Sequence, residues 1–233
     1  RSTLFPYTTL FRSRFDRKLE QLNVELIRMG ALCEEAISIV AKSLLDSDLT
    51  YLPHALDLDD QIDDKEREIE GLCMKILLQQ QPVASDLRVV SSALKMISDM
   101  ERIGDQAYDI AEITKFIKED RSSFNHDHIS VMADTAIQMV TESVDSFVKR
   151  DMDLANKVIL KDDIVDELFD KVKDDLITAV TEDKDCAEYF IDILMIAKYL
   201  ERISDHAVNI AEWVIFSITG EHVNEKNIEK DKI

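Results

Sequence analysis

Apolar side chains recur every three or four positions over long stretches of this chain, which is the spacing of amphipathic α-helices. The first stretch begins near Arg14, and its apolar stripe consists of Phe15, Leu19, Leu22, Leu26, Met29, Cys33, Ile37, Val40 and Leu44. A second helix is expected from about Leu52 to Gln80, because Pro53 suits a first helical turn and Pro82 disfavours helix just before it. A third helix is expected from Pro82 or Ser85 to about Lys118.

The second half of the chain follows the same plan. Residues 121–125 form the clearest linker, since they are short, polar and poor in periodic apolar positions. Three more helices are expected over Ile129–Val148, Met152–Thr181 and Ala187–Ile218, with Gly220 as a stop signal. We therefore predict an all-α fold of two tandem three-helix bundles with up-down antiparallel helices, over residues 14–120 and 124–221, followed by a charged tail, 222–233.

A twelve-residue segment supports this division because it occurs twice. Residues 101–112 return as residues 201–212, with eight of the twelve positions identical. Such an internal repeat indicates two copies of one structural unit.

The first thirteen residues differ in character from the rest. They contain no acidic residue, although the whole chain carries a net charge of −20. They also lack the apolar run and cleavage pattern of a signal peptide. We interpret residues 1–13 as a foreign prefix; the alternative is a native N-terminus that frays.

The net charge excludes several classes of function. A chain at −20 lacks the basic face of a nucleic-acid-binding protein, and it suits a partner with basic patches or a site that collects cations. No apolar run approaches the length of a membrane-spanning helix. Three scattered cysteines without a CxxC motif indicate a reduced, cytosolic compartment.

Both copies of the repeat place a Glu and an Asp four residues apart, on one helix face, where their charges repel each other. Each half offers a matching Asp pair on its middle helix. The candidate metal ligands are Asp59, Asp63, Glu101 and Asp105 in the first half, and Asp162, Asp166, Glu201 and Asp205 in the second. If these rims face each other, four carboxylates converge in each bundle.

Two interpretations of these pairs remain open. In a chain this acidic, roughly ten such pairs arise by chance and are ordinary solvated faces. The repetition at matched positions favours bound cations instead, and oxygen ligands suit Mg²⁺, Mn²⁺, Ca²⁺ or Fe³⁺, with Zn²⁺ less typical. His206 and Asp109 are second-tier candidates, because their counterparts are Gln106 and Asn209. Arg102 and Arg202 are expected to point away from the acidic rows.

No catalytic constellation is visible. None of the five histidines follows a Glu by three positions, so the Glu-x-x-His motif of ferritin-like di-iron enzymes is missing. There is also no phosphate-binding loop, dinucleotide fingerprint or recognisable nucleophile–base pair.

Several motifs together resemble the PhoU family of phosphate-transport accessory and regulatory proteins. They are Gln81-Pro-Val-Ala-Ser-Asp-Leu-Arg88, Met100-Glu-Arg-Ile-Gly-Asp105, Leu200-Glu-Arg-Ile-Ser-Asp205 and the opening Phe15-Asp-x-x-Leu with Met29-Gly30. The resemblance extends from Arg14 to about Glu221. Two departures are Ser204, where the first copy has Gly104, and the weaker opening of the last helix at Cys186; both question whether the two sites are equivalent.

The resemblance implies a function that composition alone does not. Members of this family have two three-helix bundles, are cytoplasmic and often homodimeric, and are negative regulators of the phosphate-starvation response. They act between the high-affinity phosphate ABC transporter and a sensor histidine kinase. Some bind multinuclear iron, or zinc and other divalent ions such as manganese or magnesium, through E/D-x-x-x-D motifs at the eight positions named above. The alternatives are a carboxylate-bridged metal enzyme, or a metal-storing helical scaffold without a phosphate role.

Overall fold

The computed structural model describes residues 6–80, 84–117 and 124–223, and all the regular secondary structure in these ranges is helical. The six α-helices and two short 3₁₀ turns are α1 (Pro6–Leu45), η1 (Leu49–Tyr51), α2 (Leu52–Gln80), α3 (Ala84–Phe116), α4 (Asp127–Lys149), α5 (Met152–Glu182), η2 (Lys184–Cys186) and α6 (Ala187–Thr219). The predicted all-α fold is confirmed.

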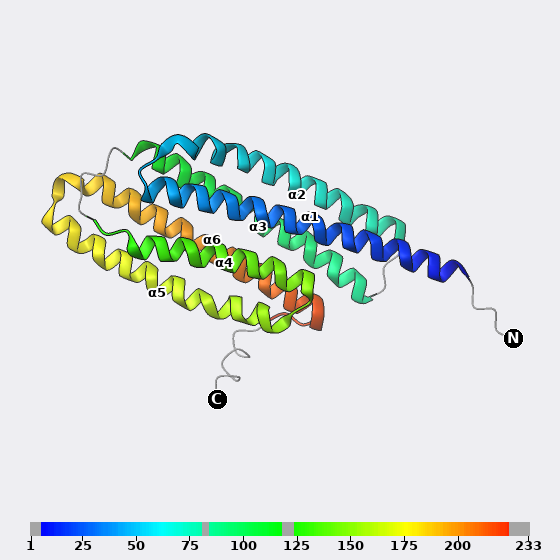
Figure 1. Cartoon of the computed structure of the whole chain (residues 1–233). Helices are drawn as coiled ribbons and strands as arrows, with labels where there is room; N and C mark the ends of the chain where they lie inside the picture. Colours follow the sequence, from blue (N-terminus) through cyan, green and yellow to red (C-terminus); the bar gives the residue numbers. More distant parts are fainter. Residues whose placement is uncertain (1–5, 81–83, 118–123, 224–233) are drawn as a thin grey trace, which may run out of the picture.

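The helices lie in two three-helix bundles placed side by side (Figure 1). In the first bundle α2 packs on α1 and α3, and in the second α5 packs on α4 and α6. The bundles meet through two helix pairs, α3 with α6 and α1 with α4. One continuous set of buried apolar side chains runs through both bundles, so the halves share a core.

The same local signals end the first helix of each half. Ser47 and Arg150 adopt left-handed backbone conformations, with φ of 53° and 52°. Each is followed by an aspartate that caps the next helical turn: Asp48 accepts from the Thr50 N–H at 2.9 Å and Asp151 from the Leu154 N–H at 3.0 Å. Residues 103 positions apart are therefore equivalent in this part of the two halves.

The contact between α3 and α6 contains a polar seam. Asp99 accepts from the Asn209 amide at 3.1 Å and lies 3.0 Å from the His206 ring, Oδ1 to Nδ1. The side chains of Asp99 and His206 are mostly buried. Asp109, further along α3, acts on Tyr199, which comes earlier in α6 than His206, so the two helices run antiparallel.

Most predicted boundaries agree with the structure, and one differs. The first helix begins at Pro6 instead of near Arg14, because proline suits a first turn and residues 7–13 contain no helix breaker. Gly220 is the expected stop: it adopts φ of 82° and its N–H bonds the Phe216 carbonyl. Pro82, residues 121–123 and most of the charged tail lie outside the described residues.

No helix in the described ranges is both long enough and apolar enough to cross a lipid bilayer.

Gly220→Ala should destabilise the protein by about 1 kcal/mol or more, because alanine is strained at positive φ. Its methyl group would also lie 3.4 Å from the Arg88 guanidinium carbon. The matched control is Gly71→Ala within α2, where an added carbon meets nothing within 4 Å. That change should stabilise the protein by up to about 1 kcal/mol. Urea unfolding measures the stability change of each variant. Equal changes at the two sites would contradict a specific need for glycine at position 220.

Candidate functional site: two carboxylate clusters

The structure brings the predicted acidic residues together in two groups. The first cluster comprises Asp59 and Asp63 of α2 with Glu101 and Asp105 of α3. The second comprises Asp162 and Asp166 of α5 with Glu201 and Asp205 of α6. In each group the charges of one helix act on the carboxylates of its neighbour, so each set converges across a helix pair.

A glycine allows the close helix approach in the first cluster. A side-chain carbon at Gly104 would lie 3.0 Å from Ile62 Cδ1 and 3.4 Å from Asp59 Oδ1. The Asp59 carboxylate therefore rests against the backbone of α3, within one turn of Glu101 and Asp105. In the second cluster Ser204 occupies this place, fully buried, and its hydroxyl donates to the Glu201 carbonyl at 2.6 Å.

Burial and mutual repulsion make ionisation unfavourable in the first cluster. Burial, followed by the charges of Asp105 and Asp63, raises the pKa of Asp59 to about 6. Burial and Asp105 also raise the pKa of Glu101, although the neighbouring Arg102 guanidinium offsets part of that rise.

The second cluster behaves alike. Burial, then the charges of Asp166 and Asp205, raises the pKa of Asp162 to about 6. The pKa values of Asp166 and Asp205 are also raised, mainly by burial and then by Glu201. Asp162 Oδ1 is buried and makes no hydrogen bond of good geometry among the described residues, although the neighbouring Ser204 hydroxyl lowers the pKa of this carboxyl and so offsets part of the rise. An oxygen in that position fits a cation ligand, because a buried acceptor without a well-formed hydrogen bond is otherwise costly.

The two clusters differ in their immediate neighbours. Ser98 donates to Glu66 at 3.2 Å beside the first cluster. At the equivalent position of the second cluster, Lys198 forms an ion pair with Glu201 and lies 5.4 Å from the centre of the Phe169 ring. The second cluster thus includes an ammonium group where the first has a serine and an additional carboxylate.

Sequence reasoning missed this difference, although the repeat contained the signal. Extending the repeat three residues toward the N-terminus pairs Ser98 with Lys198. The expectation that the arginines point away from the acidic rows is wrong for Arg102, which binds Asp105 at 2.8 Å and lies 3.5 Å from Glu101. Arg202 instead lies over the Tyr199 ring. Arg102 thus reaches one turn toward the C-terminus of its helix, and Arg202 one turn toward the N-terminus.

The second-tier candidates take other places. His206 lies against Asp99 in the seam between the bundles instead of completing the second cluster. The charge of Asp109 contributes to the raised pKa of Asp59 and, after burial, to that of Tyr199, so Asp109 borders both the first cluster and the seam.

As they stand, the carboxylates are not arranged as a finished coordination sphere. In the ranges that the structure describes, no three Cys, His, Asp or Glu side chains already have the spacing to hold one ion. In these side-chain positions the clusters offer carboxylate oxygens with raised pKa values but no preformed ion site among the described residues.

Comparison with known proteins adds an independent finding. The model of the family described as "PhoU domain" matches residues 26–114 and 129–214, one match in each half of the chain. The chain belongs to the PhoU family. Both matches fall within the two predicted repeat units, and they cover all eight carboxylate positions.

Relatives and solved structures agree with this membership. A "phosphate-specific transport system accessory protein PhoU homolog" of Clostridium acetobutylicum is 35% identical over 91% of this chain and 98% of its own length. The homolog of Pseudomonas aeruginosa is 34% identical over 94% of this chain and 91% of its own length.

Two solved PhoU structures are also similar in fold. The crystal structure of PhoU from Pseudomonas aeruginosa superposes with a TM-score of 0.84 at 35% identity, covering 89% of this chain and all of that one. The regulatory protein PhoU from Streptococcus pneumoniae superposes with a TM-score of 0.83 at 26% identity, covering 90% of this chain and 99% of that one. PhoU proteins are transport accessory and regulatory proteins, so membership confirms the prediction that the chain is not an enzyme.

Replacing Asp59 and Asp162 by asparagine should raise the melting temperature of the metal-free protein at pH 7.5. Both carboxylates have folded-state pKa values of about 6, above their ordinary value of 3.8. Their ionisation therefore costs stability above pH 6, and this cost disappears as the pH falls through 6 toward 3.8. After solvent screening we expect a gain of roughly 1 kcal/mol, or about 2–4 °C.

The gain should shrink to nothing by about pH 4, which calorimetry across pH can follow. Asp16→Asn with Asp153→Asn removes the same charge at exposed positions and is the matched control. A variant that melts at or below the parent temperature at pH 7.5 would refute buried repulsion in the clusters.

Proposed function

We propose that this chain is an accessory regulator of a phosphate-specific transport system. One observation supports this most strongly: the PhoU domain is matched in both halves, and relatives named as accessory proteins of that system align over more than nine-tenths of the chain. The chain carries the whole two-bundle unit, so the role of the relatives is proposed for all of it.

The proposed regulator works in the cytoplasm between the phosphate ABC transporter and a sensor histidine kinase. There it acts as a negative regulator that keeps the starvation response off when phosphate is plentiful. Its charge of −20 supports docking on cytoplasmic loops of membrane proteins, because these loops carry an excess of lysine and arginine. We further propose that it acts as a homodimer.

Metal ions are proposed as structural components of the two clusters. Asp59, Asp63, Glu101 and Asp105 would hold ions in the first bundle, and Asp162, Asp166, Glu201 and Asp205 in the second. The oxygen-only donor set suits multinuclear iron, manganese or magnesium, with zinc as an alternative. The burial of Asp162 Oδ1 and the raised carboxylate pKa values support this proposal. A bound cation would offset the repulsion and link the two helices of each pair.

Deleting the gene should raise a phosphate-starvation reporter several-fold in phosphate-rich medium, because the negative regulator is lost. The same reporter in phosphate-poor medium, where the response is already on, is the control. An unchanged reporter in rich medium would refute the regulatory role and leave a metal-storing scaffold.

Protein purified without chelator should contain stoichiometric metal by mass spectrometry. The variant Glu101→Gln, Asp105→Asn, Glu201→Gln, Asp205→Asn should lose most of it while keeping its helical circular dichroism. The Asp16→Asn, Asp153→Asn variant should retain its metal. Equal metal content in the parent and the four-residue variant would show that the clusters are not the binding sites.

A further inference from the structure

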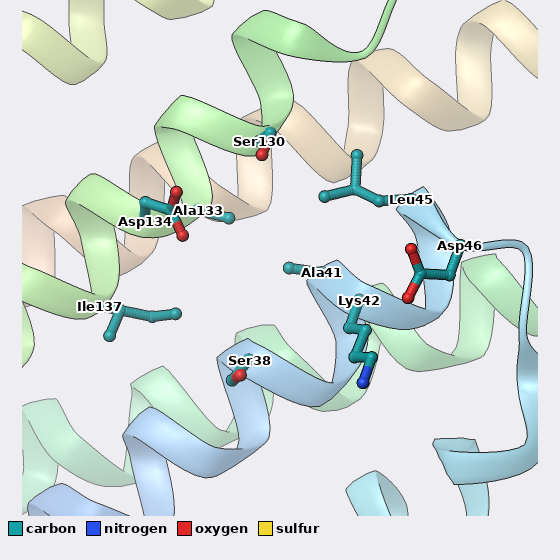
Figure 2. Close-up of a pocket in the computed structure, with 9 residues that line it drawn as sticks. All are labelled: Ser38, Ala41, Lys42, Leu45, Asp46, Ser130, Ala133, Asp134 and Ile137. Carbon is teal, nitrogen blue, oxygen red and sulfur yellow. The ribbon is translucent and has the colours of Figure 1, made fainter.

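A half-enclosed recess of about 180 Å³ lies between the last turns of α1 and the first half of α4 (Figure 2). Its lining combines apolar side chains, two hydroxyls, two carboxylates and one lysine. The lining residues are Ser38, Ala41, Lys42, Leu45, Asp46, Ser130, Ala133, Asp134 and Ile137. Figure 2 shows the methyl groups of Ala41 and Ala133 directed toward each other across the gap.

The recess exists because the repeat is imperfect. At the equivalent place on the other side of the α1–α4 contact, Gly30 faces Val144, and a carbon added at Gly30 would lie 3.3 Å from Val144 Cγ2. The counterparts of these residues, 103 positions away, are Ala133 and Ala41. Two small side chains therefore stand where the other end has a valine packed tightly against glycine.

Ser38 in the recess also lacks the partner that its counterpart in the other half has. Thr141 donates to Glu34 at 3.1 Å, whereas the equivalent pair is Ser38 and Ile137, which cannot form this hydrogen bond. Among the described side chains, no hydrogen bond or ion pair engages the Ser38 and Ser130 hydroxyls or the Asp46 and Asp134 carboxylates. Their oxygens are available to a ligand with several N–H donors.

The one cation of the lining is occupied elsewhere. The Lys42 ammonium lies 5.8 Å from the centre of the Tyr51 ring, and in Figure 2 its side chain turns away from the gap. The recess itself is thus bordered by negative charge and floored by methyl groups. That combination suits a ligand with an apolar stem and a cationic end.

Size and position narrow the choice of ligand. Pockets for drug-sized molecules enclose about 300–1,000 Å³, whereas a cavity of about 150 Å³ accepts a benzene-sized group. The recess therefore fits one side chain. The start of α1 and the end of α6 both lie at the opposite end of the molecule, so a protein partner is a better source than this chain's own termini (Figure 1).

We infer that this recess receives an arginine side chain from a protein partner. The arginine stem would lie on Ala41, Ala133 and Ile137, and its guanidinium would lie at the rim, between the carboxylates of Asp46 and Asp134 on opposite sides of the gap. Arginine is enriched among the side chains that dominate protein interfaces, and its planar group carries five N–H donors for carboxylate and hydroxyl oxygens. The inference rests on the docking role proposed above and gives that docking an anchor point.

The test uses the full chain with ¹³C-labelled alanine methyl groups and acetyl-arginine methylamide as the probe. We expect saturable shifts of the Ala41 and Ala133 methyl signals with a dissociation constant of about a millimolar, as suits a single side chain. The citrulline analogue has the same shape without the charge, and it should bind at least about tenfold more weakly.

Three variants define the site. Asp46→Asn with Asp134→Asn should lower the affinity for the probe roughly tenfold, since two exposed charge pairs are lost. Ala41→Val installs the residue of the other half, fills the recess and should abolish binding without loss of helical signal. Asp16→Asn with Asp153→Asn, equal in charge but remote, should change the affinity less than about twofold.

Shifts that do not saturate, that are equal with citrulline, or that persist in Ala41→Val would overturn the inference. Such a failure is separate from failure of the regulatory role, which the starvation reporter measures without any probe. Conversely, if gene deletion left the starvation reporter unchanged in phosphate-rich medium while the probe bound normally, that result would support the recess as an arginine site and refute the phosphate role.

Discussion

The antiparallel contact between α3 and α6 is the constraint on which the rest of the structure depends. It is the most extensive helix–helix contact of the described residues, and it places the two copies of the repeat back to back. Buried apolar residues of both helices belong to the shared core, and Asp99 adds polar contacts with His206 and Asn209 across the contact. Because each helix uses one side for this contact, its carboxylates must face its own α2 or α5. The position of both clusters follows.

Much of this arrangement was predictable because it follows from short-range patterns in the sequence. Apolar periodicity located six helices, and the repeat located both carboxylate pairs on α3 and α6. The structure places Asp59 and Asp162 beside these pairs, since residues at the edge of a buried stripe on neighbouring antiparallel helices come together. The start of α1 at Pro6 was missed, because the unusual composition of the first residues was given more weight than their lack of helix breakers.

Other features depended on side-chain reach, which spacing does not encode. Arg102 bends back to Asp105, and His206 crosses to Asp99 on the other bundle. The Arg102–Asp105 pair has the i,i+3 spacing of neighbours on one helix, whereas the His206–Asp99 contact joins two helices and is not visible along either. The recess between α1 and α4 is a further case: it depends on Ala41 and Ala133 facing each other, which only the register of two helices from different halves determines.

The equivalence of the two halves has a consequence for the organisation of the fold. Ser47 and Arg150 turn alike, Asp48 and Asp151 cap alike, and α3 meets α6 as identical surfaces meet across a two-fold axis. One half alone would expose the apolar face of its third helix to water, so it would be stable only when paired with a second copy. The two halves are thus arranged as the subunits of a dimer would be, within one chain. Because they are separate stretches of sequence, no symmetry is required of them, and each half can carry residues, such as Lys198 or Ala41, that the other lacks.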